Sequence, residues 1–285
     1  MRSLLFVPAD SERKLARSLE SGADALILDL EDSVVAANRP TARKQAREFM
    51  EAHGPERVRR YVRINALASG LALDDLAATV AGRPDGILLP KCVPADVRTL
   101  DHYLSAFEAA CGAPLGAIRI VAIATETAEA VFALGGYRGA SPRLEALTWG
   151  AEDLSASIGG NNRTIAGDYD GPYLLARSLC LLAAAAAEVL AIDTIYTDFK
   201  DDAGLKAESF AARRSGFAGK MAIHPAQLAI INEAFSVSAA ERDWAERVVA
   251  AFAARPDAGT LALDGKMIDK PHLVLARRLL GLGPA

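Results

Sequence analysis

Charged side chains in this sequence follow directly after short apolar runs. In LTWGAEDLSASIGGNNR (147–163), an apolar run closes with Trp149 and Gly150, and Glu152 and Asp153 come next. Polar residues hold comparable positions elsewhere: Asp29, Glu31, Asp32, Arg63, Asn65, Lys91, Glu126, Asp198, Lys200, Asp201 and His224. Carboxylates that lie close together repel each other unless a cation lies among them. If these runs end on one side of the molecule, their polar residues predict an active site that holds a cation.

The donor types indicate which cation this would be. Oxygen ligands without a His or Cys cluster favour Mg²⁺ or Mn²⁺ over Zn²⁺, and Mg²⁺ is usually held by one or two carboxylates that leave positions for water and substrate. Glu126 and Asp153 follow adjacent runs and form the natural pair, whereas Asp29 and Glu31 could act through water. Taken alone, Asp153 could instead cap a helix, and His224 could be a packed loop residue.

The elements that must position these residues alternate regularly along the chain. Eight short β-branched or Leu-rich runs are predicted as strands: 3–8, 25–31, 59–65, 86–91, 118–126, 145–150, 191–196 and 220–225. Amphipathic helical patterns separate them, which predicts βαβ units and a parallel sheet. Eight such units predict an α/β fold, a (β/α)8 TIM barrel over residues 1–225, whose catalytic residues collect at the C-terminal strand ends. A doubly wound sheet is the alternative, but no GxGxxG follows the first strand.

The chain beyond the eight repeats, residues 226–285, has a different pattern. It contains a helical stretch (240–254), a loop, a short LALDGKMID segment and a last helix (271–281). No low-complexity linker precedes it. We therefore expect a C-terminal helical and extended extension rather than a second domain.

Composition excludes several classes of protein. The 285 residues are 51% apolar with a net charge of −4 and no basic stripe, which argues against nucleic acid and anionic membranes as partners. The apolar run in MRSLLFVPADSERK is too short for a signal peptide or a membrane span. Cys92, Cys111 and Cys180 are widely spaced and give no disulfide framework. A cytoplasmic protein is expected.

A set of segments in order carries a family resemblance. RSLLFVPA, DALILDLEDSV, YVRIN, GILLPK, ATETAEAV, WGAEDLSASIG, AIDTIYTDFKD, GFAGKMAIHP and DGKMIDKPH occur in succession between about residues 2 and 280. Together they closely resemble the citrate lyase β-subunit-like branch of the HpcH/HpaI aldolase superfamily. The resemblance implies a TIM barrel that assembles as a homotrimer or as a hexamer and needs Mg²⁺. It also implies cleavage or formation of a C–C bond beside a CoA thioester.

The resemblance also assigns roles to individual residues. It implies Glu126 and Asp153 as metal ligands and Arg63 as the residue that binds the substrate's reacting oxygens. It implies contacts with CoA for Phe6, Arg13, Arg17, Ile223 and His224. Asp269 in MIDKPH matches a catalytic acid/base that reaches the site from a neighbouring subunit, so the extension is expected to contribute to the oligomer and to that subunit's active site. Arg13 and Arg17 stand where relatives often have Lys, which changes the geometry of a phosphate contact.

These features predict a Mg²⁺-dependent carbon–carbon lyase. The expected substrate is a β-hydroxyacyl-CoA, citramalyl-CoA or malyl-CoA, cleaved to acetyl-CoA and an α-keto acid, pyruvate or glyoxylate. The nearest alternative is a citrate lyase β subunit that cleaves a carrier-bound citryl thioester to oxaloacetate. A free-acid aldolase is disfavoured by the MIDKPH tail. A non-catalytic protein on the same barrel would be expected to lack Glu126, Asp153 or Arg63.

Overall fold

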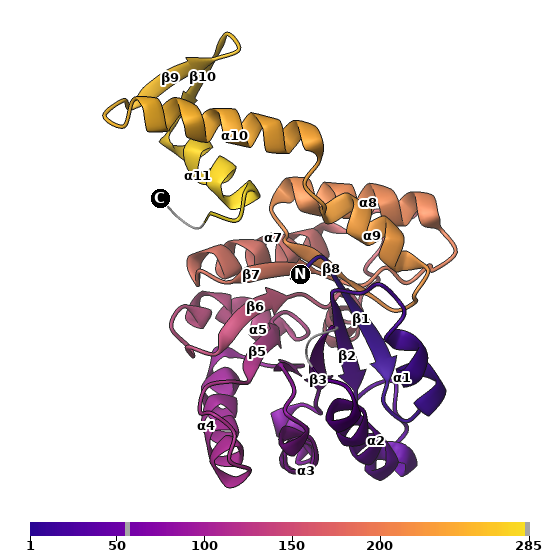
Figure 1. Ribbon diagram of the computed structural model, residues 1–285. Helices are drawn as coiled ribbons and strands as arrows, with labels where there is room; N and C mark the ends of the chain where they lie inside the picture. Colours follow the sequence, from indigo (N-terminus) through magenta and orange to yellow (C-terminus); the bar gives the residue numbers. More distant parts are fainter. Residues whose placement is uncertain (55–57, 283–285) are drawn as a thin grey trace. The chain divides into compact units, whose positions relative to one another are not determined.

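Eight parallel strands close into a barrel in the order in which they occur along the chain (Figure 1). The computed structural model describes residues 1–54 and 58–282. The strands are β1 (Ser3–Pro8), β2 (Ala25–Asp29), β3 (Arg59–Arg63), β4 (Gly86–Leu89), β5 (Arg119–Ile123), β6 (Leu144–Thr148), β7 (Leu190–Asp193) and β8 (Gly219–Ala222). β1 pairs with both β2 and β8, which closes the ring. The predicted TIM barrel is confirmed.

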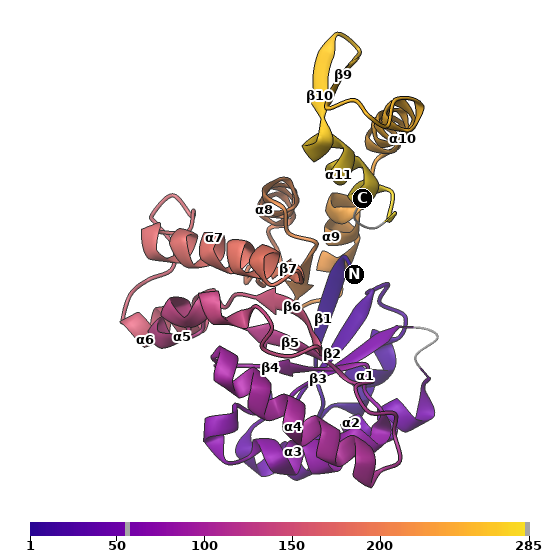
Figure 2. The ribbon, with the colours of Figure 1, turned by 90° about the vertical axis from the view of Figure 1, so that its left-hand side faces the viewer.

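Helices connect the strands and lie around the outside of the barrel (Figure 2). They are α1 (Glu12–Ser18), α2 (Arg39–Ala52), α3 (Ala72–Thr79), α4 (Pro94–Ala110), α5 (Ala128–Ala133), α6 (Ala151–Ile158), α7 (Gly171–Ala186), α8 (Asp202–Ser215) and α9 (Gln227–Phe235). Short 3₁₀ turns are η1 (Ala36–Asn38), η2 (Leu67–Ser69), η3 (Val80–Gly82) and η4 (Leu134–Tyr137). None of the helices in the described part of the chain is long and apolar enough to cross a membrane.

Alternation along each strand divides the apolar residues between two cores. Ile27 belongs to a cluster that fills the barrel, while its neighbours Leu26 and Leu28 belong to the larger cluster beneath the helices. Tyr61 is a large member of the inner cluster and is fully buried. A Cβ on Gly86 would lie 2.5 Å from the Tyr61 ring, so β4 needs glycine at this position. The packed interior makes the barrel a rigid support for the loops at its ends.

The chain divides into two compact units, Met1–Phe235 and Ser236–Ala285. This boundary lies ten residues beyond the end expected for the barrel at residue 225. The difference arises because α9 packs against β8 and α8, with Leu228, Ile231 and Ala234 in the large core cluster. α9 is therefore the helix that completes the last βα unit of the barrel.

The second unit contains α10 (Ala239–Ala254), an antiparallel hairpin of β9 (Thr260–Leu263) and β10 (Lys266–Asp269), and α11 (Lys270–Leu279). Asp264 and Gly265 form the hairpin turn with φ of 50° and 74°, the left-handed geometry that a two-residue turn requires. Val248, Phe252 and Ile268 belong to a small core of its own. The mixture of helix and hairpin agrees with the pattern expected for the extension.

Candidate active site at the carboxyl end of the barrel

A cavity of about 380 Å³ is lined by residues in or just beyond the carboxyl-terminal part of the strands. Its lining includes Phe6, Asp29, Arg63, Glu126, Trp149, Asp153 and Ile223. Strand order along a closed parallel barrel brings these positions together, although they span more than two hundred residues of sequence. The cavity lies where the fold concentrates catalytic groups in other barrels of this kind.

Glu126 is a deeply buried carboxylate of this site. It follows β5 and is 3% exposed, and its Oε2 accepts a hydrogen bond from the backbone N–H of Lys91. A Cβ at Gly150 would lie 2.7 Å from Glu126 Cγ, so the glycine before α6 makes room for this side chain. Burial, together with the nearby charge of Asp153, raises the pKa of Glu126 well above its ordinary value. A cation beside Glu126 would stabilise the charged form of this carboxylate.

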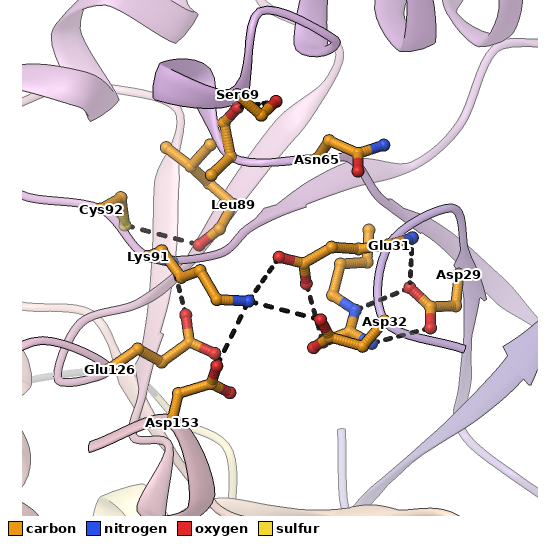
Figure 3. A network of polar contacts seen from close by, with 12 residues as sticks. Asp29, Glu31, Asp32, Asn65, Ser69, Leu89, Lys91, Cys92, Glu126 and Asp153 are labelled. Carbon is orange, nitrogen blue, oxygen red and sulfur yellow. Dashed lines mark hydrogen bonds and ion pairs between the residues drawn. The ribbon is translucent and has the colours of Figure 1, made fainter. Parts of the chain in front are cut away.

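Asp153 lies in the first turn of α6, and its side chain is 33% exposed. The N-cap of that helix is Gly150, so the alternative interpretation of Asp153 as an N-cap is wrong. The carboxylate Oδ1 lies 3.3 Å from Lys91 Nζ, and Figure 3 shows Glu126 and Asp153 side by side. The two carboxylates predicted to form a pair are therefore brought together.

Lys91 places a positive charge between carboxylates from several loops (Figure 3). Its Nζ lies 2.6 Å from Glu31 Oε1, and Asp32 and Asp153 lie within 3.5 Å. Its backbone has φ of 48°, the left-handed region that a side chain rarely adopts, and this turns the N–H toward Glu126. Burial disfavours the ammonium, but the hydrogen bond with Glu31 and the other carboxylates raise the pKa of Lys91.

Arg63 forms a bidentate hydrogen-bonded contact with Asp29. Its Nε and Nη2 donate to the two carboxylate oxygens of Asp29, each at 2.7 Å, and its Nη1 lies 3.0 Å from Glu31. The guanidinium also lies over the Phe6 ring, 4.8 Å from its centroid. Burial alone would raise the pKa of Asp29, but the hydrogen bonds and charge of Arg63 keep it below its usual range. Asp29 and Glu31 thus contact Arg63 and Lys91 directly, and their action on a cation through water stays a prediction.

The residues present fit a magnesium ion. In the described residues, no group of three or more His, Cys, Asp or Glu side chains could hold a metal by itself. Mg²⁺ does not need such a group, because one or two carboxylates plus water and substrate oxygens are typical. Glu126 and Asp153 supply two carboxylates on the wall of one cavity. The ammonium of Lys91 already occupies part of this acidic environment, which shows that a positive charge is favourable there.

The residues expected to contact CoA differ in their relation to the cavity. Phe6 and Ile223 line the cavity, and Arg13 and Arg17 are exposed on α1. The His224 ring stacks on Phe199, with 5.2 Å between the ring centroids. Phe199 was not predicted from the sequence, because an isolated aromatic residue in a polar loop carries no periodic signal.

Other expected residues have structural roles or lie elsewhere. Asn65 donates to the backbone of Leu30 and to Asp75, and Asp201 caps α8 through the N–H of Gly204. Asp269 lies in the second unit, at the N-cap of α11.

A buried hydrogen-bond and ion-pair network that was not predicted from the sequence lies behind Trp149, a lining residue of the cavity. Trp149 Nε1 donates to Asp193 Oδ1 at 2.7 Å, and the Trp149 ring meets Tyr169 edge-on. Asp193 also contacts Lys220 Nζ at 3.0 Å and Arg177 Nε at 3.0 Å. Lys220 and Asp193 are both fully buried beneath the helices. The network fixes the position of the fully buried Trp149 indole, at a residue that also lines the cavity.

Comparisons with known proteins agree with this geometry. The family model HpcH/HpaI aldolase/citrate lyase matches residues 2–225. A (3S)-malyl-CoA thioesterase from Cereibacter sphaeroides is 36% identical, covering 100% of this chain and 95% of the relative. Citrate lyase subunit beta from Escherichia coli K12 is 35% identical (98% and 92% covered), and the human mitochondrial citramalyl-CoA lyase is 31% identical (99% and 85%).

A solved structure extends this likeness to the fold and to bound ligands. The protein CitE from Mycobacterium tuberculosis, in complex with magnesium, acetoacetate and coenzyme A, has a TM-score of 0.78 and 34% identity, covering 99% of this chain and 97% of that one. Both units of this chain therefore have counterparts in that structure. The paired carboxylates beside an arginine, the closed barrel and a family match over most of the sequence lead to one conclusion: the chain is an enzyme that belongs to the HpcH/HpaI aldolase/citrate lyase family.

Proposed function

We propose that this protein is a Mg²⁺-dependent lyase that cleaves citramalyl-CoA or malyl-CoA to acetyl-CoA and pyruvate or glyoxylate. The observation that carries the proposal is the placement of Glu126, Asp153 and Arg63 on the wall of one cavity. Two carboxylates suit a metal-bound keto acid, and the arginine suits the anionic thioester fragment that cleavage releases. The relatives named as a citramalyl-CoA lyase and a citrate lyase subunit support a C–C lyase reaction.

Glu126 and Asp153 are the residues that would hold Mg²⁺. When bound, the ion acts as a Lewis acid toward the carboxylate and neighbouring oxygen of the α-keto acid half of the substrate. Gly150 makes room for Glu126, and the Lys91 N–H fixes one of its oxygens. The protein thus orients the ligand oxygens before substrate arrives, which reduces the cost of ordering them during reaction.

Arg63 stabilises the negative oxygen that develops on the thioester side. Its guanidinium stays charged at all relevant pH values, and the two bonds to Asp29 hold it in a fixed orientation. A preorganised donor of this kind is typically worth 10²–10³-fold in kcat. Phe6 beneath the guanidinium restricts its movement on the other side.

The extension supplies proton transfer through Asp269, at the active site of a neighbouring subunit in a homotrimer or hexamer. When each subunit contributes its extension to the active site of the next, the subunits form a closed ring. Phe6, Ile223 and His224 contact the CoA moiety, and Arg13 and Arg17 meet its phosphates. The two arginines lie four residues apart on α1, and both side chains are exposed.

A thioesterase is the second candidate, because a relative of that name matches the whole chain at 36% identity. The two reactions begin from the same thioester but break different bonds: the lyase breaks a C–C bond, whereas the thioesterase adds water to the thioester carbonyl. A citrate lyase β subunit is the third candidate, supported by a relative at 35% identity.

Product analysis separates the three candidates. Purified protein with Mg²⁺ is given (S)-citramalyl-CoA or malyl-CoA, and acetyl-CoA, keto acid and the CoA thiol are measured. We expect acetyl-CoA and keto acid in equal amounts, and Asp269→Asn is expected to abolish them. Release of the CoA thiol with intact hydroxy acid would instead establish the thioesterase. Turnover only with a citryl group on an acyl-carrier protein would establish the citrate lyase subunit.

A further inference from the structure

Lys91 meets the two proposed metal ligands through two different groups. Its backbone N–H donates to Glu126 Oε2, which fixes one ligand oxygen. Its ammonium, at the far end of the side chain, lies 3.3 Å from Oδ1 of Asp153, the other proposed ligand. The backbone of Lys91 therefore helps to orient a carboxylate for a metal ion, whereas its side chain places a positive charge beside the second carboxylate that the ion needs.

The ammonium of Lys91 also has partners on the other side (Figure 3). Its Nζ lies 2.6 Å from Glu31 Oε1 and 3.5 Å from Asp32 Oδ1. The Glu31 side chain is only 9% exposed, so the shortest of these contacts is also well shielded from water. A lysine beside three carboxylates is charged at neutral pH. The ammonium can thus keep two partners, Glu31 and Asp32, while Asp153 binds an ion.

The charges of this contact network do not balance. The carboxylates that contact Lys91 or Arg63 are Asp29, Glu31, Asp32, Glu126 and Asp153. Against these five acidic groups stand two cations, so three negative charges are left over when every carboxylate is ionised. Lys91 is the cation of this network that contacts Asp153. Without its charge four negative charges would be left over, and the site would attract a divalent cation more strongly.

We propose that the Lys91 side chain sets the affinity of the site for Mg²⁺, by opposing the ion with its own charge and so keeping it exchangeable. The inference rests on the proposed metal site and deepens it, but it does not depend on which thioester the enzyme cleaves. A unit charge within about 4–6 Å changes the affinity of a carboxylate for a proton by roughly 10- to 1000-fold. A divalent ion responds to the same field with twice the charge, so one ammonium is sufficient for a large effect.

Lys91→Met is the variant that tests this role. Methionine keeps a long side chain and the backbone N–H, so the contact with Glu126 remains while the ammonium is lost. Calorimetry on the full chain, stripped with EDTA and freed of chelator, should give a Kd for Mg²⁺ lower than that of the wild type by about 10-fold or more. Lys91→Arg keeps the charge and should keep a Kd close to the wild-type value.

Lys206→Met is the matched control, because it also removes a lysine charge that is paired with a glutamate. Lys206 lies on α8, and its Nζ is 2.9 Å from Glu233, with both side chains more than half exposed. An exposed ion pair of this kind contributes little to stability. The Kd for Mg²⁺ should therefore be unchanged in Lys206→Met.

Asp32→Asn tests the same reasoning in the opposite direction. The Asp32 side chain is 54% exposed and contacts both Lys91 and Arg63, so its substitution is compatible with folding. The change leaves two surplus negative charges instead of three and removes one of the groups that hold the ammonium away from Asp153. The Kd for Mg²⁺ should therefore rise. Since Lys91 itself is intact, this variant decides the question even if Lys91→Met does not fold.

The outcomes separate the inference from the proposed function. A Kd that is unchanged or higher in Lys91→Met, or unchanged in Asp32→Asn, would overturn the role of Lys91 while leaving the metal site standing. Equal tightening in Lys91→Arg and Lys91→Met would also overturn it, because the charge would then not be the cause. If neither the wild type nor Lys91→Met bound Mg²⁺, the proposed metal site itself would be refuted.

Discussion

Gly150→Ala tests how closely the protein positions Glu126. Gly150 has φ of −120°, which any residue can adopt, so an alanine there would not strain the backbone. Its new Cβ would lie 2.7 Å from Cγ, 3.4 Å from Oε1 and 3.5 Å from Cδ of Glu126. Carbon atoms in favourable contact are about 3.5–4.0 Å apart, so the Glu126 side chain must shift by roughly 0.8 Å or more.

A displacement of this size should weaken metal binding and catalysis without unfolding the barrel. A misplacement of about 1 Å can cost about 10²-fold in rate, which corresponds to about 2.7 kcal/mol of transition-state stabilisation. We therefore expect kcat/KM to fall by about 10²-fold, and more Mg²⁺ to be needed for half-maximal activity. The assay measures initial rates of citramalyl-CoA cleavage across a series of Mg²⁺ concentrations, with Mg²⁺ binding followed by calorimetry.

Gly135→Ala is the matched control for this experiment. Gly135 lies in η4, has no positive φ, and a Cβ there would meet nothing within 4 Å. Its variant should keep the wild-type rate and Mg²⁺ dependence. If Gly150→Ala also kept both, Glu126 would not be the metal ligand, and the reasoning from its contact with Gly150 would be refuted.

Three further changes test other parts of the site. Glu126→Gln should abolish the rise in melting temperature with Mg²⁺. In EDTA, wild-type stability measured by urea unfolding should fall as the pH rises above about 4.3, and Glu126→Gln should remove this fall. Burial raises the folded-state pKa of Glu126, so the folded protein keeps a proton that the unfolded chain releases. Arg63→Lys keeps the charge but cannot make both bonds to Asp29, so steady-state kinetics should show kcat reduced by about 10²-fold, and an unchanged kcat would count against its role. Asp193→Asn leaves the buried ammonium of Lys220 with less compensation and should lower the free energy of unfolding in urea by about 3 kcal/mol; a loss below about 1 kcal/mol would contradict the structural role.

The strands could be predicted from sequence because their apolar runs are short and separated by amphipathic helices. Except in the first strand, 3–8, their carboxyl ends were placed too late: the run 118–126 ends as strand at Ile123 and the run 25–31 at Asp29. The residues beyond these points no longer pair with the neighbouring strands, and they form the loops that carry Glu126 and Glu31. The strands are therefore shorter than predicted because their last residues belong to the loops that form the site.

The contacts inside the site could not be predicted in the same way. Arg63 and Asp29 lie 34 residues apart, and their distance is set by the pairing of β2 with β3, which no local pattern reports. The Lys91 backbone adopts a left-handed φ that sequence does not signal for a lysine. The contact of Asp193 with Lys220 depends on the pairing of β7 with β8. The residue types were visible in the sequence, but their partners follow from tertiary structure.

The central claim is that cleavage of the substrate C–C bond depends on a metal held by this site. The most direct test strips the protein with EDTA, removes the chelator, and follows keto acid release from (S)-citramalyl-CoA before and after Mg²⁺ is added back. We predict no release from the stripped protein and full recovery on addition of Mg²⁺. Release at the full rate from the stripped protein would contradict the account.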